Sequence, residues 1–144
     1  MNKKQSDATP KVVGQTAAAG FQIGVRRTLP VKAEPIWLFL TSPEGTKLWL
    51  GDLPPLLLAA EAAFESQQGI SGQFKIVKPY QQLRLRWKKS DWEKFSTLQI
   101  RLISAKNGKT TVSFHQENLA DADMREQMKE QWESVIEQLK THVC

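Results

Sequence analysis

Residues 95–118, FSTLQIRLISAKNGKTTVSFHQEN, decide the fold of this chain. Apolar and polar side chains alternate over 95–104 and again over 110–118, which is the period of a strand buried on one face. Between these runs, Asn107-Gly108 predicts a tight hairpin turn, because both residues tolerate a positive φ. The stretch therefore predicts two long antiparallel strands joined by a short turn.

A long amphipathic helix is expected after this hairpin, over about five turns at the end of the chain. Its apolar residues recur at steps of three and four and form one stripe: Met124, Met128, Trp132, Val135, Ile136, Leu139 and Val143. A stripe of this width can cover one face of an antiparallel sheet. The space between such a helix and such a sheet is the first place where we look for function.

The residues before the hairpin predict further strands and two short helices. Alternation predicts a first strand from Phe21 to near Pro30, and three later strands marked by Phe64, Phe74 and Leu85. Proline at 35 suits the first turn of a helix that stops at Ser42-Pro43. The same Ser42-Pro43 pair can cap a second short helix, which ends at Gly51. The expected fold class is α+β: a curved antiparallel sheet with one face exposed to solvent and the other face covered by helices.

Length and composition predict one ordinary globular domain. The 144 residues are 40% hydrophobic and 24% charged. We expect a flexible N-terminal arm over 1–19 and the domain over 20–144. A single cysteine at the last position, with no secretory signal pattern, favours a cytoplasmic protein. The longest apolar stretch, 53–64, contains two prolines and a glutamate, so membrane insertion is not expected.

Several short motifs occur in a fixed order along the chain: Arg27-Thr28-Leu29-Pro30, Ile36-Trp37, Thr41-Ser42-Pro43, Trp49-Leu50-Gly51, Gly69-x-x-Gly72-x-Phe74, Leu83-Arg84-Leu85-Arg86-Trp87, Gly108-Lys109-Thr110-Thr111 and Met128-Lys129-Glu130-Gln131-Trp132. This ordered set, over roughly residues 21–142, resembles the family named after the activator of heat-shock protein 90 ATPase, within the START-like (SRPBCC) superfamily. The resemblance implies a helix-grip fold. It also implies a cavity that, across the superfamily, often holds a lipid, sterol, polyketide or similar apolar molecule.

The first candidate site is a ligand cavity between the sheet and the C-terminal helix. Bulky residues on inferred inward faces are predicted to line it: Trp37, Trp49, Phe64, Phe74, Leu85, Trp87, Ile100, Phe114, Met124, Met128 and Trp132. The alternative is that these side chains fill the core at normal packing density. The leading functional hypothesis is a non-catalytic module that binds a small hydrophobic or amphipathic ligand and needs no cofactor.

The second candidate site is a basic face of the sheet. Alternation places Arg84, Arg86, Lys88 and Arg101 on one side. The net charge is +5, and the C-terminal helix region is acidic, with 3 Lys/Arg against 7 Asp/Glu over 117–144. A basic face can dock on an acidic protein partner such as a chaperone, or simply keep the sheet hydrated. Nucleic acid is not an expected partner, because no aromatics interleave with these cations.

Catalysis is the least supported hypothesis. His115 and Glu117 lie two residues apart and could form an acid–base pair, but strand alternation turns both away from the core. No phosphate-binding loop, nucleophile elbow or metal-binding motif occurs, so no metal site is expected. A superfamily enzyme would need a polar group inside the pocket. The chain is therefore not expected to be an enzyme.

Overall fold

The predicted hairpin forms two strands at the centre of the sheet. In the computed structural model, which describes residues 15–16 and 20–144, these are β6 (Ser96–Ser104) and β7 (Thr110–Leu119). Asn107 and Gly108 adopt φ values of +64° and +73° in the turn between them. The turn prediction is confirmed, because both residues take the left-handed conformation that the motif favours.

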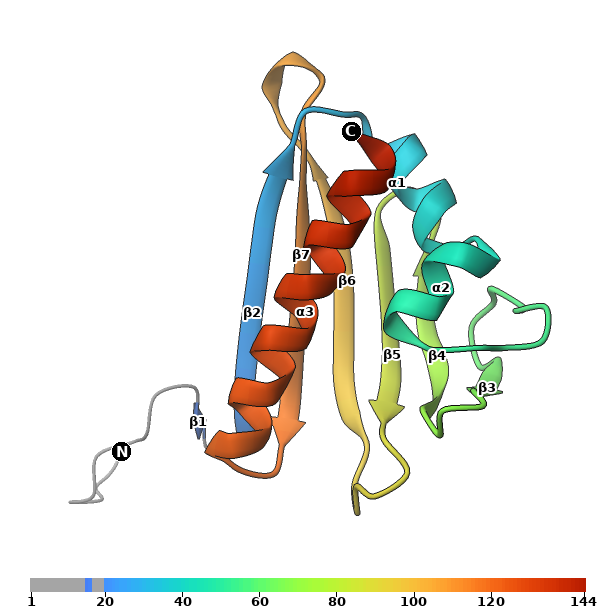
Figure 1. Cartoon of the computed structure of the whole chain (residues 1–144), viewed down its shortest axis with the longest axis vertical. Coiled ribbons are helices and arrows are strands. Elements are labelled where there is room, and N and C mark those ends of the chain that lie inside the picture. The colour runs from blue at the N-terminus through green and yellow to red at the C-terminus, as the bar shows by residue number, and fades with distance from the viewer. Residues whose placement is uncertain (1–14, 17–19) are drawn as a thin grey trace.

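Five further strands of the described residues complete one antiparallel sheet (Figure 1). They are β1 (Gln15–Thr16), β2 (Gly20–Leu29), β3 (Ala63–Glu65), β4 (Ser71–Lys78) and β5 (Gln82–Lys88). The spatial order is β1-β2-β7-β6-β5-β4-β3, so the first long strand crosses to lie beside the last. The arm predicted over 1–19 lies outside the described residues except for 15–16, and its flexibility stays a prediction.

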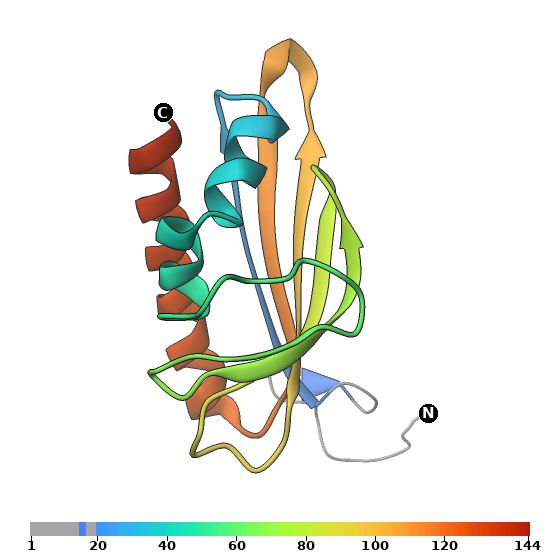
Figure 2. The same ribbon diagram turned by 90° about the vertical axis from the view of Figure 1, so that its right-hand side faces the viewer.

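The three α-helices of residues 20–144 lie on one side of the sheet (Figure 2). Two short ones, α1 (Ala33–Leu40) and α2 (Pro43–Trp49), follow β2, and the long α3 (Ala122–Val143) follows β7. As the sequence predicts, Ser42 caps α2: its Oγ accepts a hydrogen bond from the Gly45 N–H at 3.0 Å. This is the helix-grip arrangement that the resemblance implies.

The apolar stripe of α3 packs against the sheet. Its central residues Met128, Trp132, Val135, Ile136 and Leu139 are buried, while Met124 and Val143 near the two ends are half-buried. Removing these side chains from water is the main stabilising contribution of the helix.

A chain of polar contacts crosses the core beneath α3. The Trp132 indole N–H donates to Oε1 of Gln116 at 2.8 Å, and Nε2 of Gln116 donates to Oγ of Ser96 at 2.9 Å. The Ser96 hydroxyl donates in turn to the carbonyl oxygen of Trp87. Gln116 has no exposed surface. The contacts therefore link α3, β7, β6 and β5 while leaving neither end of the buried amide unsatisfied.

Two more buried indoles, those of Trp49 and Trp87, donate to backbone carbonyls. Trp49 donates to the Leu40 carbonyl oxygen and Trp87 donates to that of Trp49, both at 3.0 Å. These bonds attach the two short helices to each other and to β5. In the described part of the chain, no helix has the length and apolar character needed to span a bilayer.

Candidate functional site

The residues predicted to line a cavity are mostly core residues. Ten of the eleven are buried: Trp37, Trp49, Phe64, Phe74, Leu85, Trp87, Ile100, Phe114, Met128 and Trp132. Their rings contact one another, with centroids 5.4 Å apart for Trp87 and Trp132 and 5.2 Å apart for Phe114 and Trp132. Side chains thus occupy the space between the middle of α3 and the sheet.

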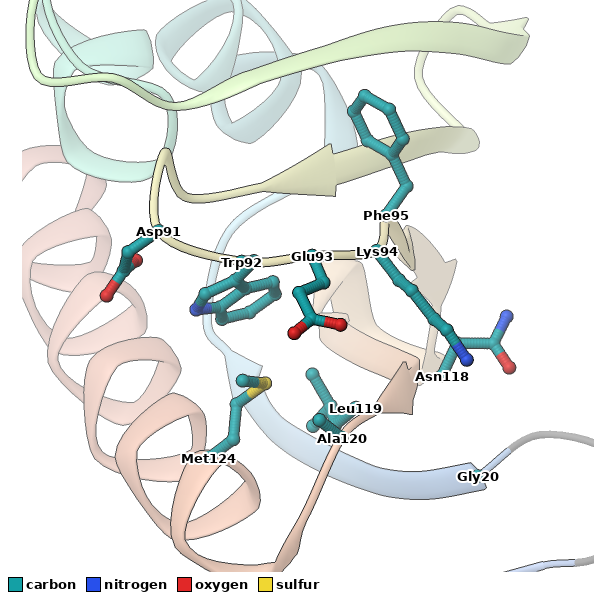
Figure 3. Close-up of a pocket in the computed structure, with 10 residues that line it drawn as sticks. All are labelled: Gly20, Asp91, Trp92, Glu93, Lys94, Phe95, Asn118, Leu119, Ala120 and Met124. Carbon is teal, nitrogen blue, oxygen red and sulfur yellow. The ribbon is translucent and has the colours of Figure 1, made fainter.

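The eleventh residue, Met124, lines a pocket at the end of the molecule where α3 begins (Figure 3). The pocket has a volume of about 710 Å³. It lies between the β5–β6 loop (residues 89–95), the connection from β7 to α3, and the start of β2. Its lining residues are Gly20, Asp91, Trp92, Glu93, Lys94, Phe95, Asn118, Leu119, Ala120 and Met124.

The pocket combines an apolar wall with a charged rim. Trp92 and Leu119 are 8% and 2% exposed, and Met124 is half-buried. Around them, Asp91, Glu93 and Lys94 are exposed. Within residues 20–144, the charged groups of these three side chains have no ion-pair partner within 4.0 Å. Apolar surface with a few unengaged polar groups is the usual composition of a small-molecule site.

The β5–β6 loop is held in place by contacts on both of its sides. Inside, the Trp92 ring lies edge-on to the buried Trp87 ring, with centroids 5.3 Å apart. Outside, Nζ of Lys88 donates to the Trp92 carbonyl oxygen at 3.1 Å. A turn within the loop is closed by the Trp92 N–H, which donates to the Lys89 carbonyl oxygen at 3.0 Å. These contacts fix the indole that forms one wall of the pocket.

The opposite wall depends on a close approach of β2 to the end of β7. Gly20 adopts a φ of +64°, and a Cβ there would lie 3.2 Å from the Leu119 carbonyl oxygen. Asn118 is also left-handed, with a φ of +66°. The chain then enters α3, whose first turn is capped by Asp121: its carboxylate accepts from the Met124 N–H at 2.8 Å. The cap holds the backbone of Met124 at the pocket.

The predicted basic face is a single surface on the side of the sheet that no helix covers. The exposed Arg84, Arg86 and Arg101 lie there with the half-buried Lys88. The ring of Phe95 lies beneath two of these cations, 5.2 Å from the Arg86 guanidinium carbon and 5.4 Å from Nζ of Lys88. The expectation that no aromatic lies among these cations was therefore wrong, because Phe95 comes from the adjacent strand end. Arg84 approaches Glu117 at 3.9 Å. The sheet register thus gathers the residues that alternation predicted.

His115 lies on this outer face, where its Nε2 contacts Oε1 of Gln22 at 3.0 Å. Glu117 is on the same face, beside Arg84. This placement confirms that neither residue points into the core. Among the described residues, no group of three His, Cys, Asp or Glu side chains is placed to hold a metal ion.

The fold and the pocket can now be compared with known proteins. Residues 30–143 match the model of the family described as Activator of Hsp90 ATPase homolog 1-like protein. The chain belongs to this family. The match covers both short helices, β3 to β7 and α3, and it confirms the resemblance carried by the ordered motifs. No curated protein sequence gave a match.

Solved structures share the fold of this family member at low sequence identity. A putative protein from the dynemicin biosynthetic locus aligns with a TM-score of 0.73 and 17% identity, over 84% of this chain but only 46% of its own length. An HSP90 activator from Plasmodium falciparum aligns with a TM-score of 0.67 and 20% identity, over 77% of this chain and 86% of its own.

A third structure, the Aha1 dimer from Colwellia psychrerythraea, aligns with a TM-score of 0.71 and 18% identity, over 85% of this chain and 95% of its own. These likenesses show the shared helix-grip fold.

Most pocket residues were not singled out by sequence reasoning. Trp92, Glu93 and Leu119 belong to no motif of the sequence. Their shared role comes from loops that meet in space. One signal for the buried network was present, however: Gln116 has the same strand parity as Val112 and Phe114, which predicts a polar side chain in the core.

Proposed function

We propose that this chain is a non-catalytic binding module that holds a small amphipathic molecule in the pocket between the β5–β6 loop and the start of α3. The pocket itself carries the proposal: about 710 Å³ is within the range of small-molecule sites. No cofactor is required, because binding would be driven by removal of apolar surface from water.

The location differs from the cavity expected from the sequence. That cavity was expected along the middle of α3, where Trp87, Phe114 and Trp132 are packed against one another. The proposed site lies outside this cluster of rings, against Trp92, whose ring contacts that of Trp87. An incoming molecule would meet the side chains of Leu119 and Met124 without displacing this core.

The expected affinity is modest. At about 25 cal/mol per Å², a ligand that hides about 200 Å² of apolar surface gains about 5 kcal/mol, before the cost of its lost freedom is subtracted. Polar contacts between the ligand and the charged residues of the rim would have to supply any further binding free energy. Apolar burial alone gives a dissociation constant no lower than about 0.2 mM, and rim contacts worth at least about 3 kcal/mol would bring it to the micromolar range.

Filling the pocket tests this proposal. The neutral dye Nile red should gain fluorescence when it binds the protein, and Ala120→Trp should weaken that binding at least about tenfold because an indole would occupy the site. Ala105→Trp, on the exposed turn between β6 and β7, is the matched control and should bind like the wild type. Equal binding by the two variants, with circular dichroism showing both folded, would contradict the proposal.

A second candidate function is docking of the basic face on an acidic protein. The observation that favours it is the exposed Phe95 between Arg86 and Lys88, because phenylalanine and arginine are enriched in protein–protein interfaces. The family description and the Plasmodium falciparum neighbour make an Hsp90-type chaperone the partner to try first.

Charge reversal tests the second candidate. Arg84→Glu combined with Arg86→Glu should weaken binding to a purified Hsp90-type chaperone more than tenfold, and added salt should weaken wild-type binding. Lys129→Glu with Lys140→Glu makes the same charge change on exposed positions of α3 and should leave binding close to wild type. Equal loss in both double variants would show a non-specific charge effect instead.

A further inference from the structure

The pocket has a charge of opposite sign to that of the chain. The net charge is +5, yet the charged residues that line the pocket are two carboxylates, Asp91 and Glu93, and one cation, Lys94. The two carboxylates have no ion-pair partner within 4.0 Å in residues 20–144. Local negative charge in a basic protein indicates that the pocket selects ligands by their charge.

The start of α3 does not neutralise these carboxylates. A helix N-terminus carries partial positive charge, but the first turn of α3 already holds Asp123, and Asp121 caps it through the Met124 N–H. The helix end is therefore satisfied by its own acidic residues. Asp91 and Glu93 remain available to a ligand.

The side chains of Glu93 and Lys94 on the rim are placed differently. In Figure 3, the carboxylate of Glu93 points into the space between Trp92 and Leu119, whereas the side chain of Lys94 extends to the far side, beside Asn118. A charged group on a ligand that lies against the apolar wall would thus meet Glu93 before it meets Lys94. The ring of Trp92 adds a surface that attracts cations.

We propose that the pocket prefers cationic amphiphiles, with an apolar body against Trp92, Leu119 and Met124 and a protonated amine beside Glu93. This inference rests on the proposed ligand-binding function and specifies the class of ligand. Carboxylates and other anionic amphiphiles of the same size bind more weakly, because they meet the same carboxylate without a compensating contact.

Three probes with one apolar body test the preference: octylamine, which is protonated at pH 7, neutral 1-octanol, and octanoate. Titrations followed by two-dimensional proton–nitrogen NMR, with the indole N–H signal of Trp92 as the reporter, give each dissociation constant. Octylamine should bind at least about tenfold more tightly than octanoate, a difference of about 1.4 kcal/mol. Added salt should reduce the ratio.

Glu93→Gln should reduce this ratio to about threefold or less, while leaving the affinity for 1-octanol within about twofold of the wild type, because the apolar wall is unchanged. Glu130→Gln is the matched control: it removes one carboxylate from an exposed position on α3, away from the pocket lining, and should preserve the ratio.

The outcomes separate this inference from the proposed function. If 1-octanol binds at Trp92 but octylamine binds no more tightly than octanoate, the pocket binds ligands and the inferred preference is wrong. A ratio that survives Glu93→Gln overturns the role given to Glu93. If none of the three probes shifts the Trp92 signal, the proposed function fails, and the inference fails with it.

Discussion

Gln116→Met should destabilise the protein by removing one buried acceptor while keeping the side chain's approximate volume. Oε1 of Gln116 is the hydrogen-bond acceptor of the Trp132 indole N–H, at 2.8 Å, and both residues have no exposed surface. In the variant that N–H stays buried without a partner, which costs about 1–3 kcal/mol. Ser96 loses one donor, but its hydroxyl still donates to the Trp87 carbonyl oxygen, so that end adds little.

Urea unfolding followed by tryptophan fluorescence measures this cost as a lower midpoint with an unchanged slope. A loss of 2 kcal/mol would lower the melting temperature by about 4–8 °C in a domain of this size. Gln99→Met is the matched control, because Gln99 lies on the outer face of the adjacent strand, where its Oε1 accepts from Gln82. Its cost should stay within about 0.5 kcal/mol.

A double-mutant cycle tests the assignment to the Trp132 indole. Trp132→Phe removes the N–H together with part of the ring, so its own cost includes a cavity. Once Trp132 is replaced, Gln116→Met should cost about 1 kcal/mol less than in the wild type, because no indole is left unsatisfied. If Gln116→Met costs no more than Gln99→Met, or if the cycle shows no coupling, the buried hydrogen bond does not have the importance given to it here.

Two further changes test local features of the fold by the same unfolding assay. Gly72→Ala should cost about 1–3 kcal/mol, because a Cβ there would overlap the Arg86 carbonyl oxygen and lie 2.8 Å from Cζ of Phe64. Gly24→Ala, whose Cβ would meet nothing closer than 3.8 Å, should be neutral or slightly stabilising, and equal losses would contradict the packing argument. Ser42→Ala should cost about 1 kcal/mol through loss of the α2 cap, whereas Ser113→Ala on the outer face should change stability by less than about 0.5 kcal/mol. A Ser42→Ala protein as stable as Ser113→Ala would show that the cap contributes nothing.

Local sequence patterns predicted the elements of this fold well. The turn at Asn107-Gly108 and the cap at Ser42 depend on backbone conformation and on hydrogen bonds to neighbours a few residues away, so they are visible in the sequence. The same is true of the burial of Trp132 and the exposure of Arg84, because alternation or helical spacing assigns each residue to a face.

The pocket was not predictable in this way. Trp92, Leu119 and Met124 come from a loop, a strand end and a helix start, and nothing in their sequence spacing brings them together. Helical spacing placed Met124 on the inward-facing stripe of the helix. It could not show that Met124, the first residue of that stripe, lies at the edge of the core and lines the pocket. Likewise, the set of large aromatics predicted an interior without showing whether their rings would line a hollow or fill it.

The sequence by itself determined which strands and helices follow one another along the chain, which of their faces are buried, and that the uncovered face of the sheet is basic. These properties follow from the periods of side-chain direction and from turn and cap chemistry, which act over a few residues. The tertiary structure alone decided that the indoles of Trp87 and Trp132 fill the space under α3, and that a pocket with Glu93 on its rim lies at the start of that helix. Both depend on how side chains distant in sequence fit together, and packing of that kind has no periodic signature along the chain.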